Sequence, residues 1–214
     1  GIKRVGRLLW RRHLTNVESL RFEDLIDTVL AEGDDHRSAV KVALEALLLS
    51  PNFIFRAEAV QTGEGFVSLP PHELATRLSY FLWSAGPDDE LLRTAEDGTL
   101  ADPEIYQAQV SRMISDERID NLGQNFAGQW LHFRDISNLD PEYALFPNFD
   151  EALREAMIME SNQWFRLILH QNRPMTELFT APYAFVDERL ARHYGVTDIE
   201  SVQFEEAHAD RGFV

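Results

Sequence analysis

The sequence of 214 residues contains no cysteine, and this absence excludes several kinds of chemistry. Disulfides, thiolate metal sites and a cysteine nucleophile all need that side chain. Covalent attachment of a c-type haem needs it as well, so these residues cannot carry one. The lack of cysteine does not indicate whether the protein works in a reducing or an oxidising compartment.

Long apolar runs are also missing. A membrane-spanning helix needs about 18 or more consecutive apolar residues. The most apolar run, 43–49, is interrupted by Glu45 and closed by Ser50 and Pro51. The sequence therefore predicts no spanning helix. Residues 1–4 do not resemble a secretory signal, so we expect any such signal to lie upstream or to have been removed.

Positive charge is scarce, since 20 Lys and Arg stand against 36 Asp and Glu and the formal net charge is −16. Affinity for nucleic acid comes mainly from clustered cations, so the composition argues against a nucleic-acid partner. Residues 1–12 are an exception, with five cations and no acid around Leu8, Leu9 and Trp10. They could form a membrane-surface helix, but a helix that packs its apolar face on the rest of the chain is the favoured interpretation.

Apolar side chains are plentiful, because 44% of the residues are hydrophobic, which is enough for a core. Helix signals recur, beginning with the capping-box pattern of Thr15 and Glu18. The predicted helices are 15–30, 38–49, 71–83, 88–95, 102–114, 117–132, 150–170, 175–179 and 186–194. The helix over 38–49 is apolar nearly all round, so we expect it to be buried. No convincing strand alternation occurs, and the predicted class is all-α: an irregular multi-helix bundle with proline-led helix starts and no significant sheet.

The glycines of the segment 63–65 predict a turn between two parts of the chain. We expect an N-terminal helical module over 1–62, which would be the end of a preceding domain. The main helical domain is predicted over 66–196. Residues 197–214 would begin a following module.

Two charged residues lie within apolar stripes of predicted helices. Arg77 follows the helical spacing of Leu74, Leu78 and Phe81. Glu160 follows the spacing of a second apolar stripe, at positions 153, 157, 164 and 168. Because a lone buried charge is much costlier than a paired one, we predict that Arg77 and Glu160 meet. Asn125 or Gln129 would complete the hydrogen bonds. The favoured interpretation is an ion pair that fixes helix register, and the alternative is a general acid or anion-binding site.

Other polar groups do not assemble into a recognisable catalytic pattern, so the catalytic residues stay unknown. Asp88, Asp89 and Glu90 could bind Ca²⁺ or Mg²⁺, but helix N-capping is favoured, because the spacing differs from that of an EF-hand loop. Asp187 and Glu188 are interpreted in the same way. The seven histidines show no metal-ligand spacing, and no metal site is predicted, although dispersed His and acids could still converge in space.

Several separated blocks of the sequence resemble a known family. They are residues 44–53, 74–84, 87–91, 125–131, 145–147 and 185–195. In this order they are similar to the helical domains of unknown function found in large multidomain planctomycete-type proteins, often associated with cytochrome-c-like modules. Residues 1 to about 60 resemble the preceding module of such proteins, and Arg211 and Gly212 the start of the following one. One departure is Asp187, where the family pattern has Asn.

The resemblance implies a piece of a larger exported, extracytoplasmic protein, in which any c-type haem belongs to another module. Other modules of the same polypeptide, a cytochrome-c-like domain among them, are the implied partners. The family has no assigned reaction, so none transfers to this chain. The leading hypothesis is a non-catalytic helical scaffold or interaction module. The rival hypotheses are part of a hydrolase or oxidoreductase completed by other regions, and a carbohydrate-binding surface of Trp83, Trp130 or Trp164, which would require exposed coplanar rings.

Overall fold

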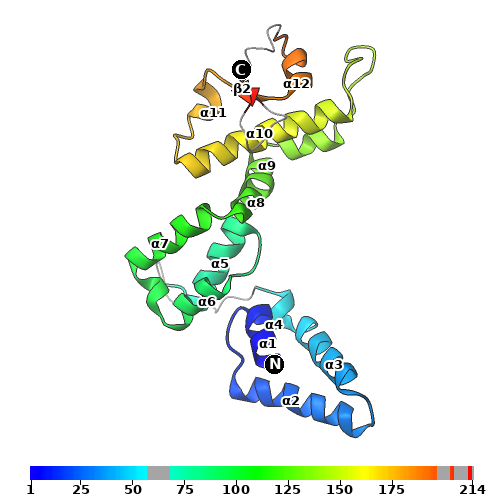
Figure 1. Ribbon diagram of the computed structural model, residues 1–214, viewed down its shortest axis with the longest axis vertical. Helices are drawn as coiled ribbons and strands as arrows, with labels where there is room; N and C mark the ends of the chain where they lie inside the picture. The colour runs from blue at the N-terminus through cyan, green and yellow to red at the C-terminus, as the bar shows by residue number, and fades with distance from the viewer. Residues whose placement is uncertain (57–67, 197–202, 205–211, 214) are drawn as a thin grey trace. The chain divides into compact units, whose positions relative to one another are not determined.

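The computed structural model describes residues 1–56, 68–196, 203–204 and 212–213. They fold into two compact units, Gly1–Arg112 and Met113–Val214. The prediction of an all-α fold is confirmed, since the regular elements of the described chain are helices apart from three two-residue strands (Figure 1). The turn predicted at 63–65 lies outside the described residues. The division between the two units falls within the segment 66–196, and the predicted domain bounds stay a prediction.

The first unit contains helices only. Its elements are α1 Ile2–Trp10, α2 Asn16–Ala31, α3 His36–Leu48, α4 Pro51–Ile54, α5 Pro71–Trp83, α6 Asp89–Glu96, the 3₁₀ turn η1 Thr99–Ala101 and α7 Pro103–Ile114, whose last turn passes into the second unit. Predicted and observed helix starts agree to within about two residues, because N-cap signals mark them. None of the helices in the described part of the chain is both long and apolar enough to cross a membrane.

The N-terminal helices α1 to α3 pack around an aromatic pair. The rings of Trp10 and Phe22 meet edge to face at 5.6 Å, and the Trp10 indole N–H donates to the Leu47 carbonyl at 3.2 Å. Trp10, Phe22 and Leu47 form one buried cluster. The apolar face of the basic N-terminal segment is therefore packed inward, as the favoured interpretation predicted.

The cations of this segment are engaged with acids and with backbone carbonyls. Arg7 donates to Glu96 at 2.6 Å and to Asp89 at 2.5 Å. Arg11, which is buried, donates to the carbonyls of residues 52, 53 and 55 around the end of α4. A cation at a helix C-terminus satisfies carbonyls that have no partner within the helix.

The capping box of α2 is present as predicted. Thr15 accepts from the backbone N–H of Glu18, and the Glu18 carboxylate accepts from the backbone N–H of Thr15 at 2.8 Å. The expectation of all-round burial for the next helix was wrong. In α3 the buried side chains form one stripe, and Leu48 and Leu49 are exposed. Helix α3 has neighbours on one side, mainly α1 and α2, so its apolar content alone does not bury it.

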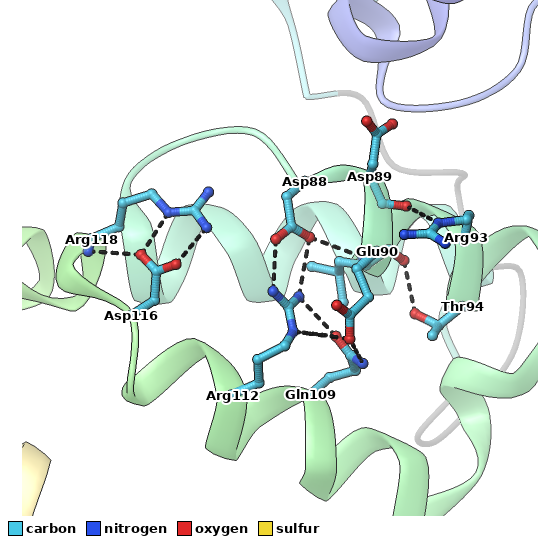
Figure 2. A network of polar contacts seen from close by, with 10 residues as sticks. Asp88, Asp89, Glu90, Arg93, Thr94, Gln109, Arg112, Asp116 and Arg118 are labelled. Atoms are coloured by element: carbon cyan, nitrogen blue, oxygen red, sulfur yellow. Dashed lines mark hydrogen bonds and ion pairs between the residues drawn. The ribbon is translucent and has the colours of Figure 1, made fainter.

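Asp88 joins α6 to α7. Its carboxylate caps α6 by accepting from Leu91 N–H at 2.9 Å and also binds the Arg112 guanidinium at 2.7 and 3.1 Å (Figure 2). The guanidinium lies over the Trp83 ring at 5.5 Å and donates to the side chain of Gln109. The capping interpretation of the acidic cluster is thus confirmed for Asp88.

The second unit begins with a helix of mixed geometry. Its elements are the 3₁₀ turn η2 Glu117–Ile119, α8 Asp120–Leu122, the π-helical turn η3 Gly123–Ala127, α9 Gly128–Trp130, the 3₁₀ segment η4 Phe133–Asn138, α10 Glu151–Gln171, α11 Glu177–Thr180, strand β1 Phe185–Val186, α12 Glu188–His193, and strands β2 Gln203–Phe204 and β3 Gly212–Phe213. The single helix predicted over 117–132 is therefore corrected, since a sequence pattern at 3.6 residues per turn cannot reveal a π turn.

Glycine allows close packing beside the π turn. A Cβ on Gly128 would lie 2.6 Å from Cγ of Arg134, well inside van der Waals contact. Gly128 therefore lets η4 approach α9 closely, and the π turn itself packs against α10.

The long helix α10 carries the core of the second unit. Leu153 and Ala156 of α10 pack against Val186, Leu190 and Ala191. Asp187 caps α12 by accepting from Leu190 N–H at 2.8 Å, as predicted for this acid. The three strands form a small sheet of order β1–β3–β2 with antiparallel pairs.

We expect Asp88→Ala to lower the free energy of unfolding by about 2 kcal/mol, because it removes a helix cap and a charge-assisted pair together. Asp88→Asn, which keeps a capping oxygen, should lose about half as much. Urea unfolding followed by circular dichroism measures both changes. The matched control is Asp97→Ala at an exposed position, with an expected change within about 0.5 kcal/mol. Equal losses for Ala and Asn would contradict the capping role.

Candidate functional site

Arg77 is not buried, which corrects the expectation that it lies within an apolar stripe. The buried face of α5 consists of Ala75, Leu78, Ser79, Leu82 and Trp83, and Arg77 is exposed. The stripe was placed one position out of register, because Phe81, assigned to the core, is also exposed. Arg77 instead borders a cavity of about 450 Å³ in the first unit.

Glu160 is half-buried and has another partner. Its carboxylate accepts a hydrogen bond from the Tyr194 hydroxyl at 2.6 Å. Asn125 and Gln129 are exposed, so their expected burial is corrected as well. The reason for expecting the Arg77–Glu160 pair, a buried guanidinium, does not hold. The two residues belong to different units, and their pairing stays a prediction.

The second unit contains a cleft of about 680 Å³ between α10 and the segment η2 to η4. Its lining is rich in amides and also carries three charged side chains. The lining residues are Ile119, Asp120, Gly123, Gln124, Asn125, Phe133, Arg134, Ser137, Ile158, Met159, Asn162, Gln163, Arg166 and Leu169. Asn125 is the one residue of the predicted polar cluster that borders this cleft.

Two acceptor atoms in the cleft lining are buried and have no hydrogen-bond partner among the described residues: Oδ1 of Asn162 and Oδ1 of Asp120. The Asn162 amide group donates to the Ile158 carbonyl at 3.0 Å, which leaves its oxygen unused. Arg166 Nε lies 3.4 Å from Asp120 Oδ1, which is an ion-pair distance without hydrogen-bond alignment. Buried acceptors without a hydrogen bond are rare in folded proteins, so these two atoms make the cleft a candidate site.

The sequence did not predict this cleft. Helical periodicity in the sequence gives no sign that Asp120, Asn162 and Gln163 differ from residues on an ordinary solvated helix face. The π turn next to them brings Gly123 within reach of α10, where a Cβ would lie 3.6 Å from Asn162 Oδ1. The amides of 124–125 and 162–163 were the available signal, but only packing brings them together.

The tryptophans of the carbohydrate hypothesis differ in exposure. Trp83 is fully buried, and Trp164 is half-buried against Tyr183, with ring centroids 5.0 Å apart. Trp130 is 52% exposed and stacks on Phe126 at 5.8 Å, with an angle of 23° between the ring planes. An exposed ring is therefore present at one of the three positions, where it is stacked on Phe126 with nearly parallel planes and does not form a coplanar platform with it.

Glu160 and Tyr194 are two hydrogen-bonded titratable groups of the second unit, and the pKa of each is raised. Burial raises the pKa of the Glu160 carboxyl, and the Tyr194 hydrogen bond only partly opposes the shift. Burial, and then the same hydrogen bond, raises the pKa of Tyr194. The pair lies outside the lining of the cleft. A hydrogen bond between a helix side chain and the residue that ends α12 is most simply structural.

The second unit also presents an apolar loop between η4 and α10, the yellow-green loop at the start of α10 in Figure 1. Its large apolar side chains point into solvent. They are Leu139, Tyr143, Leu145 and Phe146, with exposures of 51%, 76%, 73% and 53%. An exposed cluster of this kind is typical of a surface that contacts another molecule.

The described residues form an all-α fold whose second unit carries an amide-lined cleft. The chain belongs to the family described as PSD4: Protein of unknown function (DUF1592), whose model matches residues 69–196. Residues 1–58 match a second family, PSD5: Protein of unknown function (DUF1595). The resemblance to helical domains of unknown function is thus confirmed. No curated protein and no solved structure matches the chain.

Glu160→Gln tests the raised pKa of this carboxyl. The folded state holds the proton of this carboxyl more tightly than the unfolded state does, because its pKa is raised on folding. The resulting stabilisation is complete below about pH 4 and is lost as the pH rises through the folded-state pKa. Gln keeps an acceptor for Tyr194 and carries no charge. We therefore expect the variant to be more stable than the wild type at about pH 7, by less than about 1 kcal/mol because solvent screens the half-exposed group, and equally stable at about pH 4.

Thermal unfolding over this pH range measures the difference. Glu155→Gln, on the exposed face of the same helix, is the control and should show no such pH dependence. A Glu160→Gln variant that is less stable than the wild type at neutral pH would contradict the raised pKa.

Proposed function

We propose that this chain is a non-catalytic helical interaction module of a larger exported protein and that it binds other modules of the same polypeptide. A cytochrome-c-like domain is the proposed partner, with the haem carried there and not in these residues. Extracytoplasmic location belongs to the same proposal. The observation that carries it is the exposed apolar loop 139–146 at the start of α10.

The loop is held in one conformation at its base. Arg154 donates to the carbonyls of Ile136 and Leu139, the latter at 2.6 Å, and its guanidinium lies over the Phe149 ring at 5.0 Å. The backbone N–H groups of Leu145 and Phe146 both donate to the Glu142 carbonyl at 3.0 Å. A loop with this many internal contacts presents its apolar side chains at little entropic cost on binding.

The apolar side chains of the loop are the feature that a folded protein partner would recognise. Exposed Tyr and Phe are typical energetic anchors of protein interfaces, since they bury a large area with few rotatable bonds. The acidic composition of the chain fits a basic partner surface around such anchors, because opposite charges speed and orient the encounter.

Carboxylates that could in principle act as catalytic acids or bases are used in structural contacts here, and this supports a non-catalytic module. Asp88 binds Arg112 and caps α6, and Asp187 caps α12. Asp150 caps α10 by accepting from Leu153 N–H at 3.0 Å and also pairs with Arg189. Carboxylates occupied in this way hold helices in register, and such structural pairs are common outside active sites.

Replacing two loop anchors tests the interaction. We expect the double variant Leu145→Ser, Phe146→Ser to weaken binding to the separately produced remaining modules of the parent polypeptide at least roughly tenfold, because loss of a central apolar anchor typically costs that much. Isothermal titration calorimetry measures the change. The matched control is Leu20→Ser with Leu49→Ser, two exposed leucines of the first unit, which should leave the affinity unchanged.

Two outcomes contradict the interaction proposal: no binding by the wild-type chain, or equal affinity of the loop variant. The redox association has a separate check in the gene of the parent protein. A Cys-x-x-Cys-His motif outside these residues supports it, because that motif attaches c-type haem, and its absence contradicts it.

A further inference from the structure

The cleft of the second unit combines donors and acceptors. Gln124 and Asn125 come from the π turn, and Asn162 and Gln163 come from α10. Each amide side chain offers both an N–H donor and a carbonyl acceptor. A hydroxyl group has the same dual character, so a ligand with several hydroxyls can bond to every member of this set.

Two buried acceptor atoms without a hydrogen bond indicate which kind of group a ligand would supply. Asn162 Oδ1 and Asp120 Oδ1 are both acceptors, so the missing partners are donors. A sulfate or carboxylate brings only acceptors when ionised, a phosphate brings mainly acceptors, and each would face the Asp120 carboxylate. A purely apolar ligand would leave both oxygens unpaired. The hydroxyls of a ligand donate to such atoms and relieve the cost of their burial.

The charges within the cleft favour a neutral ligand. Asp120 lies at ion-pair distance from Arg166, and His170 Nε2 is 3.9 Å from the same oxygen. Arg134 adds one further cation to the lining. Since most of this charge is compensated locally, the field at the cleft gives little attraction for a charged ligand, and hydrogen bonds must supply the specificity.

Size and the apolar part of the lining agree with this chemistry. The volume of about 680 Å³ lies in the range of roughly 300–1,000 Å³ that is typical of small-molecule sites. Phe133 and Leu169 border the cleft beside its polar groups. A sugar ring has the matching surface, with apolar C–H faces and a hydroxyl rim.

We propose that this cleft binds a neutral oligosaccharide, with Asn162 and Asp120 accepting hydrogen bonds from its hydroxyls. The cleft differs from the tryptophan surface considered from the sequence, since none of its lining residues is Trp. The proposal goes beyond the interaction module, because the apolar loop contacts a protein and the cleft holds a small polar ligand.

The first experiment titrates the 214-residue chain with neutral hexasaccharides of the cello, xylo, manno and chito series by isothermal titration calorimetry. We expect saturable binding of at least one series with a Kd of about 1 mM or tighter. The affinity should be nearly equal at about 0.1 and 0.5 M NaCl, because a neutral ligand is not subject to charge screening. Absence of saturable binding in all four series would overturn the proposal.

Variants locate the site. Asn162→Leu removes one unpaired acceptor at similar side-chain size, and Gln163→Ala truncates a neighbouring amide. Each should weaken sugar binding roughly tenfold or more, the cost of hydrogen bonds lost from a binding site. Gln171→Ala, at the exposed end of α10 and outside the cleft lining, is the matched control. Circular dichroism and thermal unfolding show whether each variant is folded.

Unchanged sugar affinity in a folded Asn162→Leu or Gln163→Ala chain would overturn the proposal. Saturable binding of inorganic phosphate in place of sugar, weakened by the same variants, would also overturn it and would assign the cleft to anions. The loop variant Leu145→Ser, Phe146→Ser should bind sugar like the wild type, so failure of the interaction proposal and failure of this one are distinguishable.

Discussion

The backbone N–H groups at the start of every helix need acceptors, and much of this structure depends on how the chain supplies them. A series of aspartates serves as N-caps. They are Asp35, Asp88, Asp102, Asp150 and Asp187. Each fixes the residue at which a helix begins, and thereby which face of that helix can reach the core. Two of them bind an arginine as well, so that the same carboxylate sets a helix start and joins two elements.

N-capping in this way accounts for five of the 36 acidic residues. Adjacent acids such as Asp88 and Glu90 look like cation ligands in the sequence, but in the fold each contacts Arg112. The Arg112 guanidinium lies over the ring of the buried Trp83, so the charge pair also packs against this aromatic side chain. Capping and packing are thus linked at one point of the first unit.

Backbone geometry, in contrast, determines the cleft of the second unit. The π turn at Gly123–Ala127 widens the helix beside α10, and Gly128 allows Arg134 to approach where a larger residue would clash. Asp120 and Asn162, which line the same cleft, each have a buried acceptor atom without a hydrogen bond. π turns are frequent at functional sites, because the extra residue in the turn reorients nearby side chains. The cleft and the apolar loop are two separate surfaces of the same unit, one lined by polar side chains and the other by exposed apolar ones.

The sequence by itself determined the all-α class, the capping box at Thr15 and the helix starts at Asp88, Asp150 and Asp187, because caps and prolines act over one turn of local chain. It did not determine which face of α5 is buried, since a shift of one residue rotates a helix by about 100°. The predicted stripe included the exposed Arg77 and Phe81 and left out the buried Ala75, Ser79 and Trp83. Only the tertiary structure decided the partner of Glu160, the π turn and the cleft. Each of these arises where segments distant in sequence pack together, and local periodicity carries no information about that packing.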